Sequence, residues 1–414
     1  MYDLLLTEQE NEVRREARAF AKTVPADLLR RMDRDEVEYP REFVEAAAKE
    51  NLLGLHFPKE YGGQGLNWCS DAMAIGEIGV LGIALSCAFS MPVIVGEAIN
   101  AFGTSEQKEK YLKGILTGKL ISAEALTEPR GGSDFFGATT VAQKKGDRYI
   151  LNGQKRFIVG GTGADFFLVY AKTDLDADPK MSLTAFLVDR SEGVKTEHKF
   201  ELLGCRGGGT ARLHFEDVEV PEENILGGPA GLNMGALVFS RMMVPERLTS
   251  ASGTIGGSEA AIKIATTYSD KRKAFGHKIK NFQGVSFKIA DSVMKLDALR
   301  ALIITAARAA DADPDSARTR RLISEAKCFS TDRGWEIVND CLQVLGGIGY
   351  TNVFPLERAL RDTRLSTIWT GSNEVMRAVI GHEWYKEFLK TEDTGRNTEQ
   401  DTVGHMYDVE KVYE

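Results

Sequence analysis

Residues 126–134, Leu-Thr-Glu-Pro-Arg-Gly-Gly-Ser-Asp, place two hydroxyl side chains and a glycine pair around a proline. Glycine leaves its backbone uncovered and accepts left-handed conformations, so backbone N–H groups in such a loop can approach a phosphate closely. The stretch therefore predicts an anion-binding loop. Gly-Gly pairs also occur in plain turns, and the residues alone leave both interpretations open.

A second glycine-containing stretch follows at residues 149–161. Apolar residues on either side of Asn152-Gly153 predict two short strands, and Asn-Gly is the strongest local signal for a type I′ hairpin turn. We therefore expect a binding surface made of the 126–134 loop and a neighbouring hairpin.

The overall composition limits the ligands that such a surface can bind. The chain has 414 residues, 43% hydrophobic and 27% charged, which is typical of a globular protein with two or three domains. Its net charge is −8, so an anionic ligand must be held by local donors, and nucleic acid is not expected as a partner. The five cysteines have no paired spacing and the six histidines no ligand spacing, so neither a disulfide framework nor a metal site is predicted.

The first residues of the sequence give no sign of a targeting segment. They lack a basic region, a long apolar run and a small-residue cleavage site, and no window of the chain reaches eighteen apolar residues. We therefore expect a cytoplasmic protein without membrane insertion.

The elements that would position the loop fall into consecutive blocks, which predict an α+β multidomain fold. Residues 1–119 show helical periodicity and predict an N-terminal all-helical domain. Residues 120–229 change to short alternating strands broken by turns, and predict a β-barrel-like middle domain. Residues 230–389 predict a C-terminal four-helix bundle whose first long helix starts at about Glu246. Residues 390–414 predict a polar tail or an arm that reaches a neighbouring subunit.

Five segments of the chain form an ordered set of motifs: Leu-Thr-Glu-Pro-Arg-Gly-Gly-Ser-Asp at 126–134, Leu-Asn-Gly-Gln-Lys at 151–155, Arg-Lys-Ala-Phe-Gly at 272–276, Gln-Val-Leu-Gly-Gly-Ile-Gly-Tyr at 343–350 and Gly-Ser-Asn-Glu-Val at 371–375. In these segments, and in their order, the chain resembles the acyl-CoA dehydrogenase family over almost its whole length. The resemblance implies FAD as cofactor, an acyl-CoA substrate, electron transfer flavoprotein as redox partner, and a homotetramer built as a pair of dimers.

The resemblance also implies a carboxylate base that removes the α-proton of the thioester. Many members place it just before the glycine of the last motif, where this chain has Thr370, and threonine cannot act as a base near neutral pH. The isovaleryl and long-chain branches place it in a Glu-Arg-Leu segment, which matches Glu246, Arg247 and Leu248. Glu246 is therefore the predicted base, although a Pro-Glu pair at a helix start is also what the helix dipole favours.

The same resemblance assigns further residues to cofactor and substrate. Val159 stands where many members have a hydroxyl that bonds flavin N5, and valine cannot donate that bond. An ordinary core strand would show the same alternation at Phe157 and Val159. The cofactor positions are Leu126, Thr127, Ser133, Phe157, Ile158, Val159, Ser372 and Glu374, with Arg272, Phe275 and Gln283 from the neighbouring subunit and Gln343, Gly346 and Gly347 at the adenosine. The substrate positions are Ser133, Arg247, Gly371 and Thr370, the last through its backbone N–H.

Three alternatives to a dehydrogenase linked to electron transfer flavoprotein remain open. Because Thr370 and Val159 depart from the family pattern, the chain could be a non-catalytic homologue that binds flavin or CoA. The same fold also serves oxidases that use dioxygen, and the same residues would serve an enoyl-CoA reductase. The acyl group is expected to be branched, long, alicyclic or aryl-substituted, because the resemblance associates such groups with a base at the position of Glu246.

Overall fold

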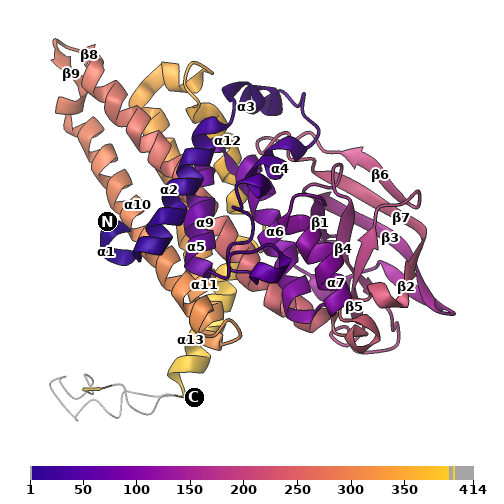
Figure 1. The fold of residues 1–414 in the computed structure, drawn as a ribbon. Helices are drawn as coiled ribbons and strands as arrows, with labels where there is room; N and C mark the ends of the chain where they lie inside the picture. The colour runs from indigo at the N-terminus through magenta and orange to yellow at the C-terminus, as the bar shows by residue number, and fades with distance from the viewer. Residues whose placement is uncertain (1, 391–394, 397–414) are drawn as a thin grey trace.

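A computed structural model describes residues 2–390 and 395–396 and shows three parts (Figure 1). The N-terminal helices lie between a curled β-sheet on one side and a bundle of long helices on the other. The predicted α+β fold, with its helical N-terminal part, its curled sheet and its C-terminal bundle, is confirmed. The predicted tail at 390–414 lies outside the described residues, apart from residues 390, 395 and 396.

Two N-terminal helices start with capping boxes. The Thr7 hydroxyl accepts the Glu10 N–H while the Glu10 carboxylate accepts the Thr7 N–H, and Thr104 and Gln107 repeat the arrangement. The bounds are α1 Tyr2–Leu5, α2 Glu8–Thr23, α3 Ala26–Asp33, α4 Arg41–Lys49, α5 Trp68–Ile78, α6 Ile83–Phe102, α7 Ser105–Gln107 and α8 Lys113–Leu116.

Helix α6 forms the centre of the N-terminal part. It is the one helix in the described chain that is long and apolar enough to cross a membrane, with a mean hydropathy of 1.5. However, 94% of its apolar window is buried inside the protein. The composition of α6 is thus accounted for by its place in the core, where it packs against α5 and α9.

The middle part is one seven-stranded sheet in the order β1-β4-β2-β3-β7-β6, with β5 paired to β4. Strands β4 and β5 are buried along almost their whole length, which explains their continuous apolar sequences. The bounds are β1 Ser122–Ala125, β2 Val141–Lys145, β3 Arg148–Ile158, β4 Phe166–Lys172, β5 Leu183–Asp189, β6 Val194–Lys199 and β7 Ala211–Pro221.

The hairpin predicted at Asn152-Gly153 is wrong. Strand β3 continues through both residues, because it pairs with β2 on one side and β7 on the other, and the turn between β2 and β3 lies at Gly146. Gly153 marks a bulge instead: its φ is +152°, and a Cβ there would lie 2.6 Å from the Thr140 hydroxyl. The side-chain amide oxygen of Asn152 accepts the Asp217 N–H of β7 at 2.9 Å and holds the bulge in place.

Long helices joined by short connections form the C-terminal part. Helix α9 begins at Gly235, so the predicted start at Glu246 is wrong, and Pro245 lies inside the helix. Helix α12 has no counterpart in the sequence-based prediction. The bounds are α9 Gly235–Lys271, β8 Lys273–Ala274, β9 His277–Lys278, α10 Gln283–Ala312, α11 Ala317–Leu345, α12 Leu356–Ser366 and α13 Asn373–Phe388.

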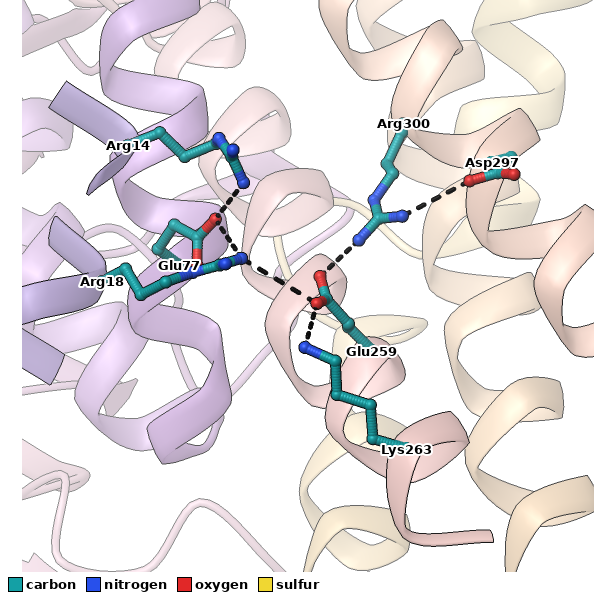
Figure 2. Close-up of polar contacts among 7 residues, drawn as sticks. All are labelled: Arg14, Arg18, Glu77, Glu259, Lys263, Asp297 and Arg300. Atoms are coloured by element: carbon teal, nitrogen blue, oxygen red, sulfur yellow. Dashed lines mark hydrogen bonds and ion pairs between the residues drawn. The ribbon is translucent and has the colours of Figure 1, made fainter. Parts of the chain in front are cut away.

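An ion-pair network joins the N-terminal helices to the bundle (Figure 2). Glu77 of α5 accepts bonds from Arg14 and Arg18 of α2, at 3.0 and 2.8 Å. Arg18 also lies 3.8 Å from Glu259 of α9, which in turn pairs with Arg300 of α10. The network therefore ties α9, the helix that contains Glu246, to three other helices. Its members are Arg14, Arg18, Glu77, Glu259, Lys263, Asp297 and Arg300.

Candidate active site

A cavity of about 770 Å³ lies where β1 and β3 meet α6, α9 and residues 365–375. Part of its wall is apolar, with Met91 and Ile94 from α6 and Phe239 and Met243 from α9. Another hollow, of about 830 Å³, opens between α2 and residues 59–64, and its lining comes from outside the predicted set. The predicted residues that line the first cavity are Leu126, Thr127, Ser133, Phe157, Ile158, Val159, Glu246, Arg247, Thr370, Gly371 and Ser372.

The structure does not bring the other predicted residues to this cavity. Glu374 lies close by in the first turn of α13, but its side chain is exposed. The remaining ones lie where α9 and α11 end and α10 begins, and Phe275 among them is 92% exposed. Their exposure would suit contact with a neighbouring subunit, and this role stays a prediction. They are Arg272, Phe275, Gln283, Gln343, Gly346 and Gly347.

The Thr-Glu-Pro and Asn-Gly-x-Lys motifs are tied together by a buried ion pair. The Lys155 ammonium of β3 lies 2.8 Å from the Glu128 carboxylate, and their side chains are 0% and 3% exposed. Glu128 also accepts the Thr139 N–H and hydroxyl and, at 3.0 Å, the Thr140 N–H. Burial alone would raise the pKa of Glu128, but the charge and hydrogen bond of Lys155 and the bonds from Thr139 lower it to about 2. This pair anchors the 126–134 loop to the sheet.

Glu246 reaches the cavity from the interior of α9. Its position three turns inside the helix removes the helix-dipole interpretation, which applies to the first turn only. The residue is 7% exposed, and its Oε1 is buried without a hydrogen-bond partner among the described residues. Burial raises the pKa of Glu246, while a hydrogen bond with Glu124 and the charge of Arg247 oppose that rise.

Two buried cations support the Glu246 side of the cavity. Arg247 is 6% exposed and donates to the Ser324 hydroxyl at 3.0 Å. Burial lowers the pKa of Arg247 to about 10. Lys327 of α11 donates to the Gly371 carbonyl at 2.7 Å and to the Asn373 side chain at 2.9 Å. Lys327 thereby fixes the turn that presents residues 370–372 to the cavity.

Sequence reasoning missed Glu124 of β1, a second carboxyl group on the cavity wall. It lines the same cavity as Glu246, and the Tyr170 hydroxyl donates to its Oε1 at 3.3 Å. Burial, and next the charge of Glu246, raise the pKa of Glu124 well above its usual range. The available signal was a lone glutamate in the otherwise uncharged segment 120–127.

Family models match three consecutive parts of the chain. They are the acyl-CoA dehydrogenase N-terminal domain at residues 7–119, the middle domain at 123–218 and the C-terminal domain at 233–384. The chain belongs to the acyl-CoA dehydrogenase family. It is an oxidoreductase that acts on CH–CH bonds and uses FAD.

Relatives of this acyl-CoA dehydrogenase family member span its length. It is 37% identical to 3-(aryl)acrylate reductase of Clostridium sporogenes, with 92% of this chain and 100% of the relative covered. It is also 37% identical to a subunit of the caffeyl-CoA reductase-Etf complex of Acetobacterium woodii, covering 91% and 98%. The solved structure of butyryl-CoA dehydrogenase from Megasphaera elsdenii matches with a TM-score of 0.86 at 30% identity, covering 92% and 99%.

The residues around the cavity fit FAD. Gly131 faces open space, because a Cβ built there would have nothing within 4 Å in the described chain, so the loop backbone is accessible to a phosphate. Phe157 and Thr370 line the cavity with left-handed φ angles of +58° and +51°, a strain that clusters at ligand sites. Phe157 is 48% exposed, and the Arg156 guanidinium lies over its ring, 4.2 Å from the centroid.

Proposed function

We propose that this acyl-CoA dehydrogenase family member interconverts a saturated acyl-CoA and its 2-enoyl-CoA, and that Glu246 is the group that moves the α-proton. The supporting observation is the Glu246 carboxyl itself, which faces the cavity, is buried, and has an oxygen without a partner in the described chain. Such an oxygen is free to take a substrate proton. Burial also raises the pKa of Glu246, which brings a carboxylate base closer to the working pH.

FAD, when bound, supplies the acceptor for the hydride from the β carbon. The chain's own residues must bind the thioester and stabilise the negative charge that grows on its oxygen as the α-proton leaves. We assign this role to the backbone N–H of Thr370. The turn around it is held by Lys327, whose ammonium donates to the Gly371 carbonyl. Loop residues Leu126, Thr127 and Ser133, with Phe157, would hold the cofactor.

For the acyl group we infer a bulky and preferably aryl-substituted chain. The apolar wall of Met91, Ile94, Phe239 and Met243 suits such a group. The names of two relatives, a 3-(aryl)acrylate reductase and a caffeyl-CoA reductase subunit, point to the same class of substrate. Both names also favour reduction of the 2-enoyl thioester as a second candidate for the physiological direction.

We further propose electron transfer flavoprotein as the redox partner, since one relative is named as a subunit of an Etf complex. The homotetramer and the cytoplasmic location stay predictions from the sequence. Size-exclusion chromatography with light scattering would test the first of these.

Anaerobic bleaching of the bound flavin tests the proposed function. The purified holoenzyme is mixed with straight, branched, alicyclic and aryl-substituted acyl-CoAs, and the flavin absorbance is followed. We expect bleaching by the aryl-substituted or another bulky class, and slow reoxidation in air but fast reoxidation by electron transfer flavoprotein. Fast reoxidation in air would favour the oxidase alternative. Absence of bleaching with every thioester would favour the non-catalytic homologue.

A further inference from the structure

The cavity brings together two carboxyl groups from distant parts of the chain, Glu124 on β1 and Glu246 on α9. Both carboxyls line the wall of one cavity, and the charge of Glu246 acts on Glu124. Two ionised carboxylates in a buried setting repel each other, which disfavours the state in which both groups are ionised.

Two buried cations near this pair donate hydrogen bonds to other groups. Lys155 of β3 donates to Glu128 at 2.8 Å and to the Tyr170 carbonyl at 2.7 Å. Arg247, next to Glu246 on α9, donates to Ser324, and its Nε is buried without a hydrogen-bond partner among the described residues. The Tyr170 hydroxyl of β4 donates to Glu124. The charge of Arg247 acts on Glu246, so a proton on Glu124 would offset the second negative charge of the pair.

We propose that Glu124 and Glu246 share one proton, which resides on Glu124 and is donated in a hydrogen bond to Glu246. Glu124 is then a positioning residue: it keeps Glu246 ionised and directed toward the substrate. This inference rests on the proposed function of Glu246. The two environments agree with the placement of the proton, since burial and the charge of Glu246 raise the pKa of Glu124 strongly, while the charge of Arg247 restrains that of Glu246.

The reaction changes the proton content of the pair by one. In dehydrogenation the α C–H bond breaks, its proton passes to Glu246, and the hydride leaves the β carbon for FAD. The pair then holds two protons and must release one before the next turnover. In the reductive direction the pair starts with two protons and gives one to the α carbon. The pH dependence of the rate therefore belongs to the pair and not to Glu246 alone.

Infrared spectroscopy of the oxidised holoenzyme without thioester tests the shared proton directly. The carbonyl stretch of protonated carboxyl groups is titrated in the wild type, Glu124→Gln and Glu246→Gln. We expect the wild-type pair to lose its two protons in steps at least about 2 pH units apart, and each variant to lose one proton between them. If the two carboxyls titrate independently, the pH-dependent change in carbonyl absorbance of the wild type will equal the sum of the changes in the two variants. This result would overturn the proposal.

Flavin reduction by an active thioester provides a second readout. Glu124→Gln retains a donor, so we expect its maximal rate within about tenfold of the wild type, with the acid limb of the pH profile displaced by at least about half a unit. Glu124→Asp should restore part of the profile, and Tyr170→Phe should leave the two-step titration in place. A loss in Glu124→Gln as large as in Glu246→Gln would make Glu124 itself the base and refute the proposal.

The two proposals fail separately. If the infrared titrations are non-additive while no thioester bleaches the flavin, the shared proton stands and the proposed function falls. If the flavin is bleached by an acyl-CoA and the titrations are additive, the proposed function stands and the shared proton falls.

Discussion

Replacement of Lys155 by methionine tests whether the buried pair with Glu128 holds the 126–134 loop in place. Both side chains are almost completely buried, at 0% and 3% exposure, and lie 2.8 Å apart. Methionine fills a similar volume without the charge, so the variant leaves the Glu128 carboxylate buried with its bonds from Thr139 and Thr140 but without a cation. Removing one partner of a buried ion pair is costly because the other charge remains.

The pKa of Glu128 sets the size of the effect. Its change from the ordinary 4.5 to about 2 corresponds to roughly 3 kcal/mol at about 1.4 kcal/mol per pKa unit. Because the folded-state pKa is lowered, this stabilisation is present above pH 4.5 and is lost as the pH falls toward 2. Burial lowers the pKa of Lys155, so the pair as a whole contributes less. We expect Lys155→Met to lower the free energy of unfolding by about 3–5 kcal/mol at pH 8.

Urea unfolding of the holoprotein, followed by flavin release and by circular dichroism, measures this difference. Without Lys155 the Glu128 carboxyl takes up a proton more readily, so the gap between wild type and variant should shrink from pH 8 to pH 5. The double variant Glu128→Gln/Lys155→Met leaves no unpaired charge and should be more stable than Lys155→Met at pH 8. A gap below about 1 kcal/mol, or one that does not change with pH, would refute this account of the pair.

Three further predictions concern other parts of the molecule. In the same urea titration, Gly153→Ala should lower the free energy of unfolding by about 2 kcal/mol or more, because its Cβ would lie 2.6 Å from the Thr140 hydroxyl. Gly146→Ala is the control: open space surrounds this glycine, and the loss should be about 1 kcal/mol. Lys327→Met removes the bonds to Gly371 and Asn373, so stopped-flow flavin reduction should slow by about tenfold or more, and an unchanged rate would show that the turn does not need them. Burial disfavours the charged form of His56, but Asp71 at 2.6 Å and Glu97 at 3.3 Å raise the pKa of His56 to about 9. The stabilisation by the protonated imidazole is therefore present below pH 6.5 and is lost as the pH rises through 9. The wild-type Tm should therefore fall from pH 6.5 to 9.5 by more than the Tm of His56→Gln, and parallel curves would contradict the assignment.

The sequence predicted the helical parts of the chain well, because the apolar residues there recur at helical spacing. The helical periodicity of residues 1–119 and 230–389 corresponds to the helices of the N-terminal and C-terminal parts, such as α2 and α11. The short helix α12 was missed because the polar residues of Leu356–Ser366 obscure its apolar stripe. The order of the three parts along the chain could be predicted, because apolar residues recur at helical spacing in the first and last parts and alternate in the middle part.

The errors have a common cause, because at each of them tertiary pairing overrode a local signal. Asn152-Gly153 favours a turn, yet pairing with β2 and β7 keeps β3 extended and turns the glycine into a bulge. Pro245 favours a helix start, yet α9 continues through it because Met242, Val244 and Leu248 on either side are buried in the core. The cavity wall brings together Glu124 and Glu246, which lie 122 positions apart in the sequence, and no local pattern could predict this.

The rate of flavin reduction in Glu246→Gln tests the central assignment most directly. Glu259→Gln is the matched control, since Glu259 lies on the same helix but belongs to the ion-pair network away from the cavity (Figure 2). With an acyl-CoA that bleaches the wild type, and with FAD content verified for each protein, we expect Glu246→Gln to be slower by about 100- to 10,000-fold and Glu259→Gln to keep the wild-type rate. A Glu246→Gln enzyme that reduces its flavin within tenfold of the wild-type rate would show that another group removes the α-proton.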